Sequence, residues 1–243
     1  LITSIILRER ADGTFTFARF YERRARRILP ALLTVMLASI PVAWLVMLPK
    51  AVKEYAGSLL SALFFSSNIW FWAEDGYWAE PSESKPFLHT WSLSVEEQFY
   101  IVFPIVVILL WRFGRRYLTP FLATVFVVSL IAAQMGSNGS SADAAFYLPH
   151  ARAWELMAGA LLAKLEIDRG RSSPHLLRRI MPGIGLAMVL LALVTFDEAT
   201  SHPSLVTLLP VVGTMLILWF GGDRRDPVSR GLGSRPFVVV GLI

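Results

Sequence analysis

The chain has 243 residues, of which 55% are hydrophobic and 17% are charged, with a formal net charge of +5 and a mean hydropathy of +0.55. Soluble domains are about 25% charged, so this composition excludes an ordinary water-soluble protein. Cysteine is absent, which excludes disulfide frameworks, cysteine zinc sites and thiol catalysis. The sequence predicts an all-α, polytopic transmembrane helix bundle.

Six stretches are nearly free of charge and long enough to cross a hydrocarbon core of about 30 Å. They are 28–48, 91–111, 117–135, 149–165, 180–196 and 203–220. Apolar stubs at 1–7 and 236–243 are too short to cross, and we expect them to be truncated helices. The whole of 1–243 is therefore predicted to be one partial transmembrane domain.

Positive charge is concentrated on one side of these spans. Nineteen of the 23 Lys and Arg residues fall in 8–27, 112–116, 164–179 and 221–235, which alternation of the six spans places together. Cytoplasmic loops of membrane proteins retain cations. The basic side is therefore predicted to be cytoplasmic.

A further apolar stretch, 55–73, cannot be a seventh crossing without moving most later basic loops to the outer side. We expect it to begin and end outside, as a re-entrant or interfacial segment whose non-helical backbone is satisfied by protein or water. Its surroundings are rich in aromatic residues, which fit either an interfacial belt or the lining of a ligand pocket. These are Phe64, Phe65, Trp70, Phe71, Trp72, Tyr77 and Trp78.

Ionisable side chains inside membrane spans usually mark a pathway or a site. Here they lie in the outer halves of 91–111 and 149–165, namely Glu96, Glu97, Arg152 and Glu155, with His89 and His150 at the outer ends. Glu96 and Glu97 point about 100° apart on a helix, so both cannot face the same partner. One reading gives one of them an interhelical hydrogen bond and the other the headgroup layer.

The second of these helices offers a structural reading as well as a functional one. Arg152 and Glu155 are spaced for an i, i+3 ion pair, which by itself lowers the cost of holding either charge in the membrane. Gly159, Ala160 and Ala163 follow and are expected to let a neighbouring helix approach closely.

The densest charge lies in 20–30, FYERRARRILP, which contains Arg23, Arg24, Arg26 and Arg27. A guanidinium fork suits phosphate oxygens. Two readings are open: an anchor for anionic lipid, or a site at the cytoplasmic mouth for the phosphates of a nucleotide or coenzyme.

Other familiar signals are missing from the sequence. It has no Walker A loop, no GxGxxG after a strand and no GxSxG elbow. His and carboxylate residues do not recur at metal-ligand spacing. We predict no metal site and no nucleic-acid partner.

Three blocks together resemble acyltransferase family 3, the bacterial membrane O-acetylases of surface polysaccharides. They are 20–33 (FYERRARRILPALL), 87–104 (FLHTWSLSVEEQFYIVFP) and 147–163 (YLPHARAWELMAGALLA). The resemblance implies a multi-pass protein of the bacterial inner (cytoplasmic) membrane. It would move an acyl group, usually acetyl from cytoplasmic acetyl-CoA, to a hydroxyl of an extracytoplasmic glycan such as lipopolysaccharide O-antigen or peptidoglycan.

The resemblance also implies roles for individual residues. Arg23, Arg24, Arg26 and Arg27 would hold the CoA phosphates, while Glu96, Arg152 and Glu155 would belong to a polar core reached by the acceptor. His89 joins these candidates because it precedes the Trp-Ser-Leu block, although it does not take the role of the family's catalytic histidine. That histidine is carried by a first helix expected ahead of residue 1, and further helices, in some relatives with an SGNH hydrolase-like domain, are expected beyond residue 243.

Two other functions remain open on the residues alone. In a transporter or flippase of lipid-linked glycan, the outer-half charges would line a substrate path, although the repeated halves common in transporters are not visible. In a membrane scaffold, the charges would only pair helices, which leaves the density of Arg residues in 20–30 without a reason.

Overall fold

The computed structural model describes residues 2–74, 85–137, 142–171, 174–197, 200–222 and 226–242. Every regular element within these ranges is helical. Among them, four helical segments are long and apolar enough to cross a membrane: α2 (Phe17–Val46), α5 (Thr90–Phe113), Arg115–Gly136, which contains α6 (Leu118–Gly136), and α9 (His175–Thr195). The predicted fold class, an all-α polytopic helix bundle, is confirmed.

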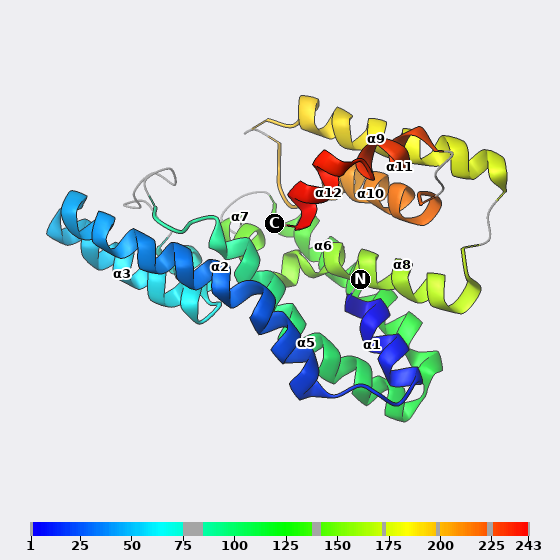
Figure 1. Cartoon of the computed structure of the whole chain (residues 1–243), viewed down its shortest axis with the longest axis horizontal. Coiled ribbons are helices and arrows are strands. Elements are labelled where there is room, and N and C mark those ends of the chain that lie inside the picture. The colour runs from blue at the N-terminus through cyan, green and yellow to red at the C-terminus, as the bar shows by residue number, and fades with distance from the viewer. Residues whose placement is uncertain are drawn as a thin grey trace.

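Shorter helices accompany these long ones (Figure 1). They are α1 (Ile2–Ala11), α3 (Pro49–Leu63), α4 (Ser67–Glu74), α7 (Ala142–Tyr147), α8 (Ala153–Arg169), α10 (Leu208–Phe220), α11 (Pro227–Leu232) and α12 (Arg235–Leu242). Short 3₁₀ turns at Arg115–Tyr117, Pro149–Ala151 and Leu205–Thr207 lead into α6, α8 and α10.

Helix α2 begins at Phe17, well before the predicted start of its span at residue 28. The arginine-rich segment is therefore part of a helix and not of a loop. Arg is a good helix former, and its long stem lets the charged group reach past apolar surface. Phe20, in the first turn, is buried among Ile6, Leu118 and other core residues, so tertiary packing supports the added turns.

Apart from a turn at 64–66, the stretch 55–73 is helical, which corrects the expected non-helical dip. Helix α3 runs back beside α2 (Figure 1), and the Tyr55 and Ser39 hydroxyls lie 2.7 Å apart. The chain then turns at Phe65, whose φ of 51° is left-handed, and continues as α4. That the segment begins and ends on the outer side of the membrane stays a prediction. Tyr77 and Trp78 lie outside the described residues.

Buried amides and hydroxyls hold α4 in place. Asn68 is fully buried; its Oδ1 accepts from Gln98 on α5 at 2.8 Å, and its Nδ2 donates to the Tyr147 carbonyl at 3.2 Å. The Ser67 and Ser94 hydroxyls lie 2.7 Å apart. Buried polar groups are stable only when they are paired, so this network fixes α4 against α5 and α7.

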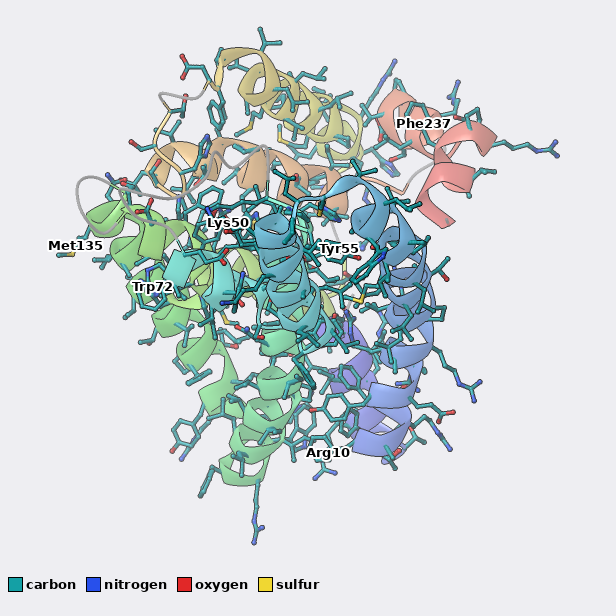
Figure 2. The ribbon with its side chains drawn as sticks, turned by 90° about the vertical axis from the view of Figure 1, so that its left-hand side faces the viewer. Arg10, Lys50, Tyr55, Trp72, Met135 and Phe237 are labelled. Atoms are coloured by element: carbon teal, nitrogen blue, oxygen red, sulfur yellow. The ribbon has the colours of Figure 1, made fainter. Side chains whose placement is uncertain are left out.

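The main hydrophobic core lies where α1, α2, α5, α6 and α8 meet, and it includes Leu7, Phe20, Phe103, Leu122 and Met157. Figure 2 shows Arg10, at the end of α1, at the bottom of the molecule, with Lys50, Trp72 and Met135 higher in the view. The core packs α2, α5 and α8 against one another through Phe20, Phe103 and Met157, and this positions the site.

Candidate functional site

A cavity of about 410 Å³ opens between α1, α2, α5 and α8. Its polar lining comes from four separate helices: Thr3, Arg24, Arg27, Glu96, Tyr100 and Glu155. The remaining wall is apolar or small, formed by Ile2, Ile28, Leu93, Phe99, Leu156, Gly159 and Ala160. Convergent charges in a largely apolar cavity are typical of ligand sites.

Arg24 is held in place on two sides. Its Nη2 donates to Glu97 Oε1 at 2.5 Å, and its guanidinium carbon lies 3.7 Å from the centre of the Tyr100 ring. Only 17% of the Arg24 side chain and 10% of the Glu97 side chain are exposed. The carboxylate compensates the buried cation and the ring face adds a cation–π contact, so Arg24 has a fixed orientation.

Arg27 lies one turn further along α2 and lines the same cavity. It is exposed, and the described residues offer it no hydrogen bond or ion pair. Arg23 and Arg26 do not line the cavity: Arg23 pairs with Glu9 at 2.9 Å, and Arg26 pairs with Glu22 at 2.7 Å. The structure therefore divides the four arginines into two that face the cavity and two that pair outside it.

Glu96 faces the cavity, and its Oε2 accepts a long hydrogen bond of 3.4 Å from the Tyr100 hydroxyl. Its neighbour Glu97 points to α2, as the 100° spacing requires. Sequence reasoning did not include Tyr100 among the site residues, and it gave an interhelical hydrogen bond to one of the two glutamates without deciding which; the structure gives it to Glu97. A signal was available, because a carboxylate in the middle of an apolar helix needs a cation from another helix.

The expected distance between the arginine segment and Glu96 is wrong, because Arg24, Arg27 and Glu96 line one cavity. The reason is the early start of α2, which brings its arginine segment alongside α5. The Tyr21 hydroxyl donates to the Ile101 carbonyl at 2.8 Å, which fixes the level of the two helices relative to each other. The level of each residue in the membrane stays a prediction.

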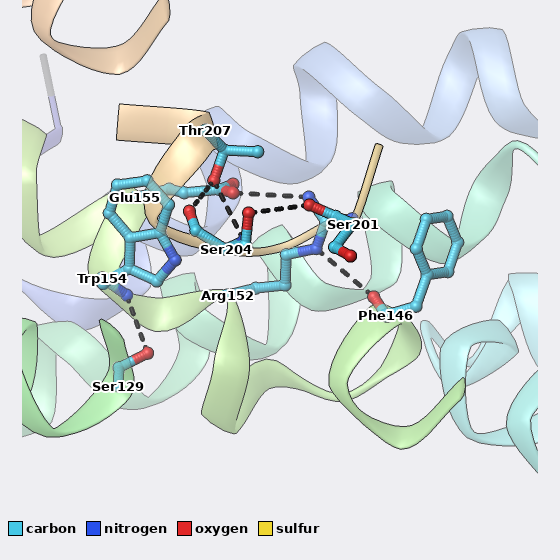
Figure 3. A network of polar contacts seen from close by, with 8 residues as sticks. All are labelled: Ser129, Phe146, Arg152, Trp154, Glu155, Ser201, Ser204 and Thr207. Atoms are coloured by element: carbon cyan, nitrogen blue, oxygen red, sulfur yellow. Dashed lines mark hydrogen bonds and ion pairs between the residues drawn. The ribbon is translucent and has the colours of Figure 1, made fainter. Parts of the chain in front are cut away.

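Glu155 of α8 also lines the cavity, and Arg152 pairs with it (Figure 3). Arg152 Nη1 donates to Glu155 at 3.3 Å, and its Nε donates to the Phe146 carbonyl at 3.3 Å. The guanidinium carbon also lies 4.9 Å from the centre of the Trp91 ring. Burial, and then the nearby positive charge of Arg152, lower the pKa of His202 in the adjoining loop.

The other predicted residues lie outside this cavity. His89 occupies the position before the first residue of α5, where it is exposed. His150 accepts a hydrogen bond from Ser129 through its backbone carbonyl. A Cβ at Gly159 would meet nothing within 4 Å, so the expected close helix contact at Gly159 is wrong, and this residue opens onto the cavity.

No group of three or more His, Asp or Glu side chains among the described residues could hold a metal ion. The charged groups that face the cavity are thus the two arginines and the two glutamates. This set can bind an anionic ligand and can accept or release a proton beside it.

Known proteins resemble the chain in sequence. A family model described as "Acyltransferase domain" matches residues 6–241. An uncharacterized protein of Haemophilus influenzae is 31% identical over 169 residues, which cover 67% of this chain and 69% of that protein. A Staphylococcus aureus (strain COL) protein provisionally named an O-acetyltransferase is 30% identical over 209 residues, 82% of this chain but 34% of that protein.

A third relative, the O-acetyltransferase OatA of Staphylococcus aureus strain NCTC 8325, is 32% identical over 134 residues, 54% of this chain and 22% of OatA. The chain thus spans about a third or less of the staphylococcal relatives. No solved structure matches it. Because the family model covers nearly all of the chain, the family predicted from the sequence is confirmed, and the chain belongs to acyltransferase family 3.

Proposed function

We propose that the protein is a multi-pass O-acyltransferase of the bacterial inner membrane, which transfers an acyl group, proposed to be acetyl, from acyl-CoA to a hydroxyl of an extracytoplasmic glycan. One observation carries the proposal: a single cavity places two arginines beside two glutamates. The names of the staphylococcal relatives support acetyl transfer to oxygen.

The arginines are proposed to bind the donor. Arg27 reaches the cavity without a protein partner among the described residues, so its fork is free to bind a phosphate with two parallel hydrogen bonds. Arg24 has much of its charge compensated by Glu97 at 2.5 Å. Arg27 is therefore the stronger phosphate ligand of the two arginines. Arg24 forms part of the cavity wall, and its N–H groups that do not bind Glu97 remain as donors.

The glutamates are proposed to act on the acceptor. Its hydroxyl oxygen attacks the thioester carbonyl carbon, a C–O bond forms, the C–S bond breaks and CoA leaves as the thiol. The hydroxyl proton must be removed in this step, and we assign its acceptance or relay to Glu96, which lines the cavity. Tyr100 orients the Glu96 carboxylate from the same helix through the 3.4 Å hydrogen bond.

Glu155 and Arg152 have different proposed roles. Glu155 lines the cavity and would contact the acceptor, since a carboxylate accepts hydrogen bonds from sugar hydroxyls. Arg152 acts through Glu155 and the aromatic side chains around it, so it is a positioning residue. His89, exposed at the start of α5, has no proposed part in the transfer.

Transfer of label from acetyl-CoA to glycan tests the proposal in membranes that contain the full-length protein. Glu96→Gln should reduce incorporation at least about a hundredfold, the usual contribution of general acid–base catalysis. Glu22→Gln, which changes an exposed carboxylate paired with Arg26, is the matched control and should behave as wild type. Wild-type incorporation by Glu96→Gln would remove Glu96 from the chemistry, and glycan movement without covalent label would support a transporter instead.

A further inference from the structure

A second hollow follows the line between α8 and α10, away from most of the cavity described above. It consists of two adjoining cavities of about 270 and 350 Å³. Leu162 and Met215 line both of them, so they form one groove, here called the α8–α10 groove. The first cavity is walled mainly by apolar residues, among them Pro210, Val211 and Leu218.

The other end of the groove is charged. Lys164, Asp168 and Arg169 line it together with Thr119 of α6. Lys164 is 8% exposed in its side chain and forms an ion pair with Asp168. Arg169 is exposed, and none of the described residues pairs with it. The end therefore carries two cations and one anion, and it lies in the basic segment 164–179.

We propose that the α8–α10 groove is a binding site for an anionic phospholipid, with its phosphate at Lys164 and Arg169 and one acyl chain running past Leu162 and Met215. The apolar part of the groove suits an acyl chain, and the cations at its other end suit the phosphate of the same lipid. Basic pockets between membrane helices on the cytoplasmic side bind anionic headgroups in this way. A soluble anion would leave the apolar part of the groove unused.

The ion pair of buried Lys164 with exposed Asp168 explains how the site holds a cation inside the groove. Asp168 compensates the charge of Lys164 when the groove is empty, because an unpaired buried charge is costly. Lys164 has three donors, so a phosphate can bind the remaining ones without displacing Asp168. Arg169 then supplies the positive charge that Asp168 does not cancel. This inference does not depend on the proposed acyl transfer, since the groove meets the first cavity only at Glu155 and Gly159.

Native mass spectrometry of the purified full-length protein tests this site by comparing retained phosphatidylglycerol with retained phosphatidylcholine. We expect preferential retention of phosphatidylglycerol, with an affinity about fivefold lower in Arg169→Gln, since each surface cation contributes about that factor. Met215→Trp, which fills the groove without changing charge, should lower the affinity as well. Arg112→Gln removes an exposed cation from the last turn of α5 and should leave the affinity unchanged.

A phosphatidylglycerol with a photoreactive acyl chain gives the location directly. Crosslinks should concentrate in 161–165 of α8 and 214–218 of α10. Equal retention of both lipids, equal effects of Arg169→Gln and Arg112→Gln, or crosslinks spread evenly over all apolar helices would overturn the proposal. Competition by inorganic phosphate would also overturn it, because the groove would then bind a soluble anion. A changed oligomeric state of Met215→Trp with unchanged lipid retention would overturn it too, because the groove would then bind a second copy of the chain.

Discussion

The Arg24 guanidinium on α2 and the Glu97 carboxylate on α5 form an ion pair of 2.5 Å between residues 73 positions apart in the chain. Both side chains are largely buried, and the Tyr100 ring covers the cation. The pair fixes how α2 lies along α5. It therefore also helps to bring Arg27, three residues after Arg24, and Glu96, directly before Glu97, to one cavity.

Breaking this pair should destabilise the protein. Removing one partner of a buried ion pair costs about 3–5 kcal/mol, because the other charge is left uncompensated. We expect Glu97→Ala to lower the free energy of unfolding by that amount in detergent, and the double variant Arg24→Met with Glu97→Leu to recover much of it. Glu22→Ala breaks an exposed pair with Arg26 and should cost at most about 1 kcal/mol. Equal losses in Glu97→Ala and Glu22→Ala would contradict a structural role for the pair.

Donor binding should distinguish the arginines that face the cavity from those that do not. Arg27→Lys keeps the charge but loses the planar fork, so the affinity for CoA, measured by isothermal titration calorimetry, should fall about tenfold, the equivalent of part of one hydrogen bond to a charged group. Arg26→Lys makes the same change at a residue that pairs with Glu22 outside the cavity, and CoA should bind it as it binds wild type. Equal affinities in the two variants would favour the reading of 20–30 as a lipid anchor.

The contact between α9 and α10 should tolerate no side chain at its closest point. A Cβ at Gly213 would lie 2.6 Å from the Gly185 carbonyl oxygen, and a Cβ at Gly185 would lie 2.4 Å from that of Gly213. Gly213→Ala should therefore lower the melting temperature, with an overpacking cost of about 1–3 kcal/mol. Gly183→Ala, also on α9, meets nothing within 4 Å and should cause no loss, since Ala favours helix over Gly. A melting temperature of Gly213→Ala at or above that of Gly183→Ala would show that the helices can separate freely.

The absence of cysteine makes the membrane orientation directly testable with single introduced thiols. Asp12 is exposed between α1 and α2 on the basic side, and Leu48 is 76% exposed at the other end of α2. An impermeant maleimide should label Leu48→Cys in intact cells and Asp12→Cys only after the membrane is permeabilised, because basic segments stay in the cytoplasm. Labelling of both thiols from the same side would overturn the assigned orientation.

Much of the fold could be predicted from local sequence, and less of the site. The apolar runs 91–111 and 117–135 correspond to α5 and α6. Such spans can be recognised locally, because entry into lipid depends on the side chains of consecutive residues. The start of α2 could not be placed in this way, since its first turns carry arginines and depend on Phe20 packing against α1 and α6. The two helices in 55–73 likewise depend on hydrogen bonds from Asn68 and Ser67 to distant residues.

The sequence by itself determined that this is a helical membrane protein of acyltransferase family 3, and it singled out Glu96, Glu155 and the arginine segment as candidates. Tertiary structure alone decided that Arg24 and Arg27 face the cavity while Arg23 and Arg26 do not, and that Glu97 is the partner of Arg24. The composition and charge of a segment determine whether that segment enters lipid or stays in water, whatever the other segments do. The pairing of buried charges depends on which helices lie side by side and at what level, and that is set by packing between segments remote in the chain.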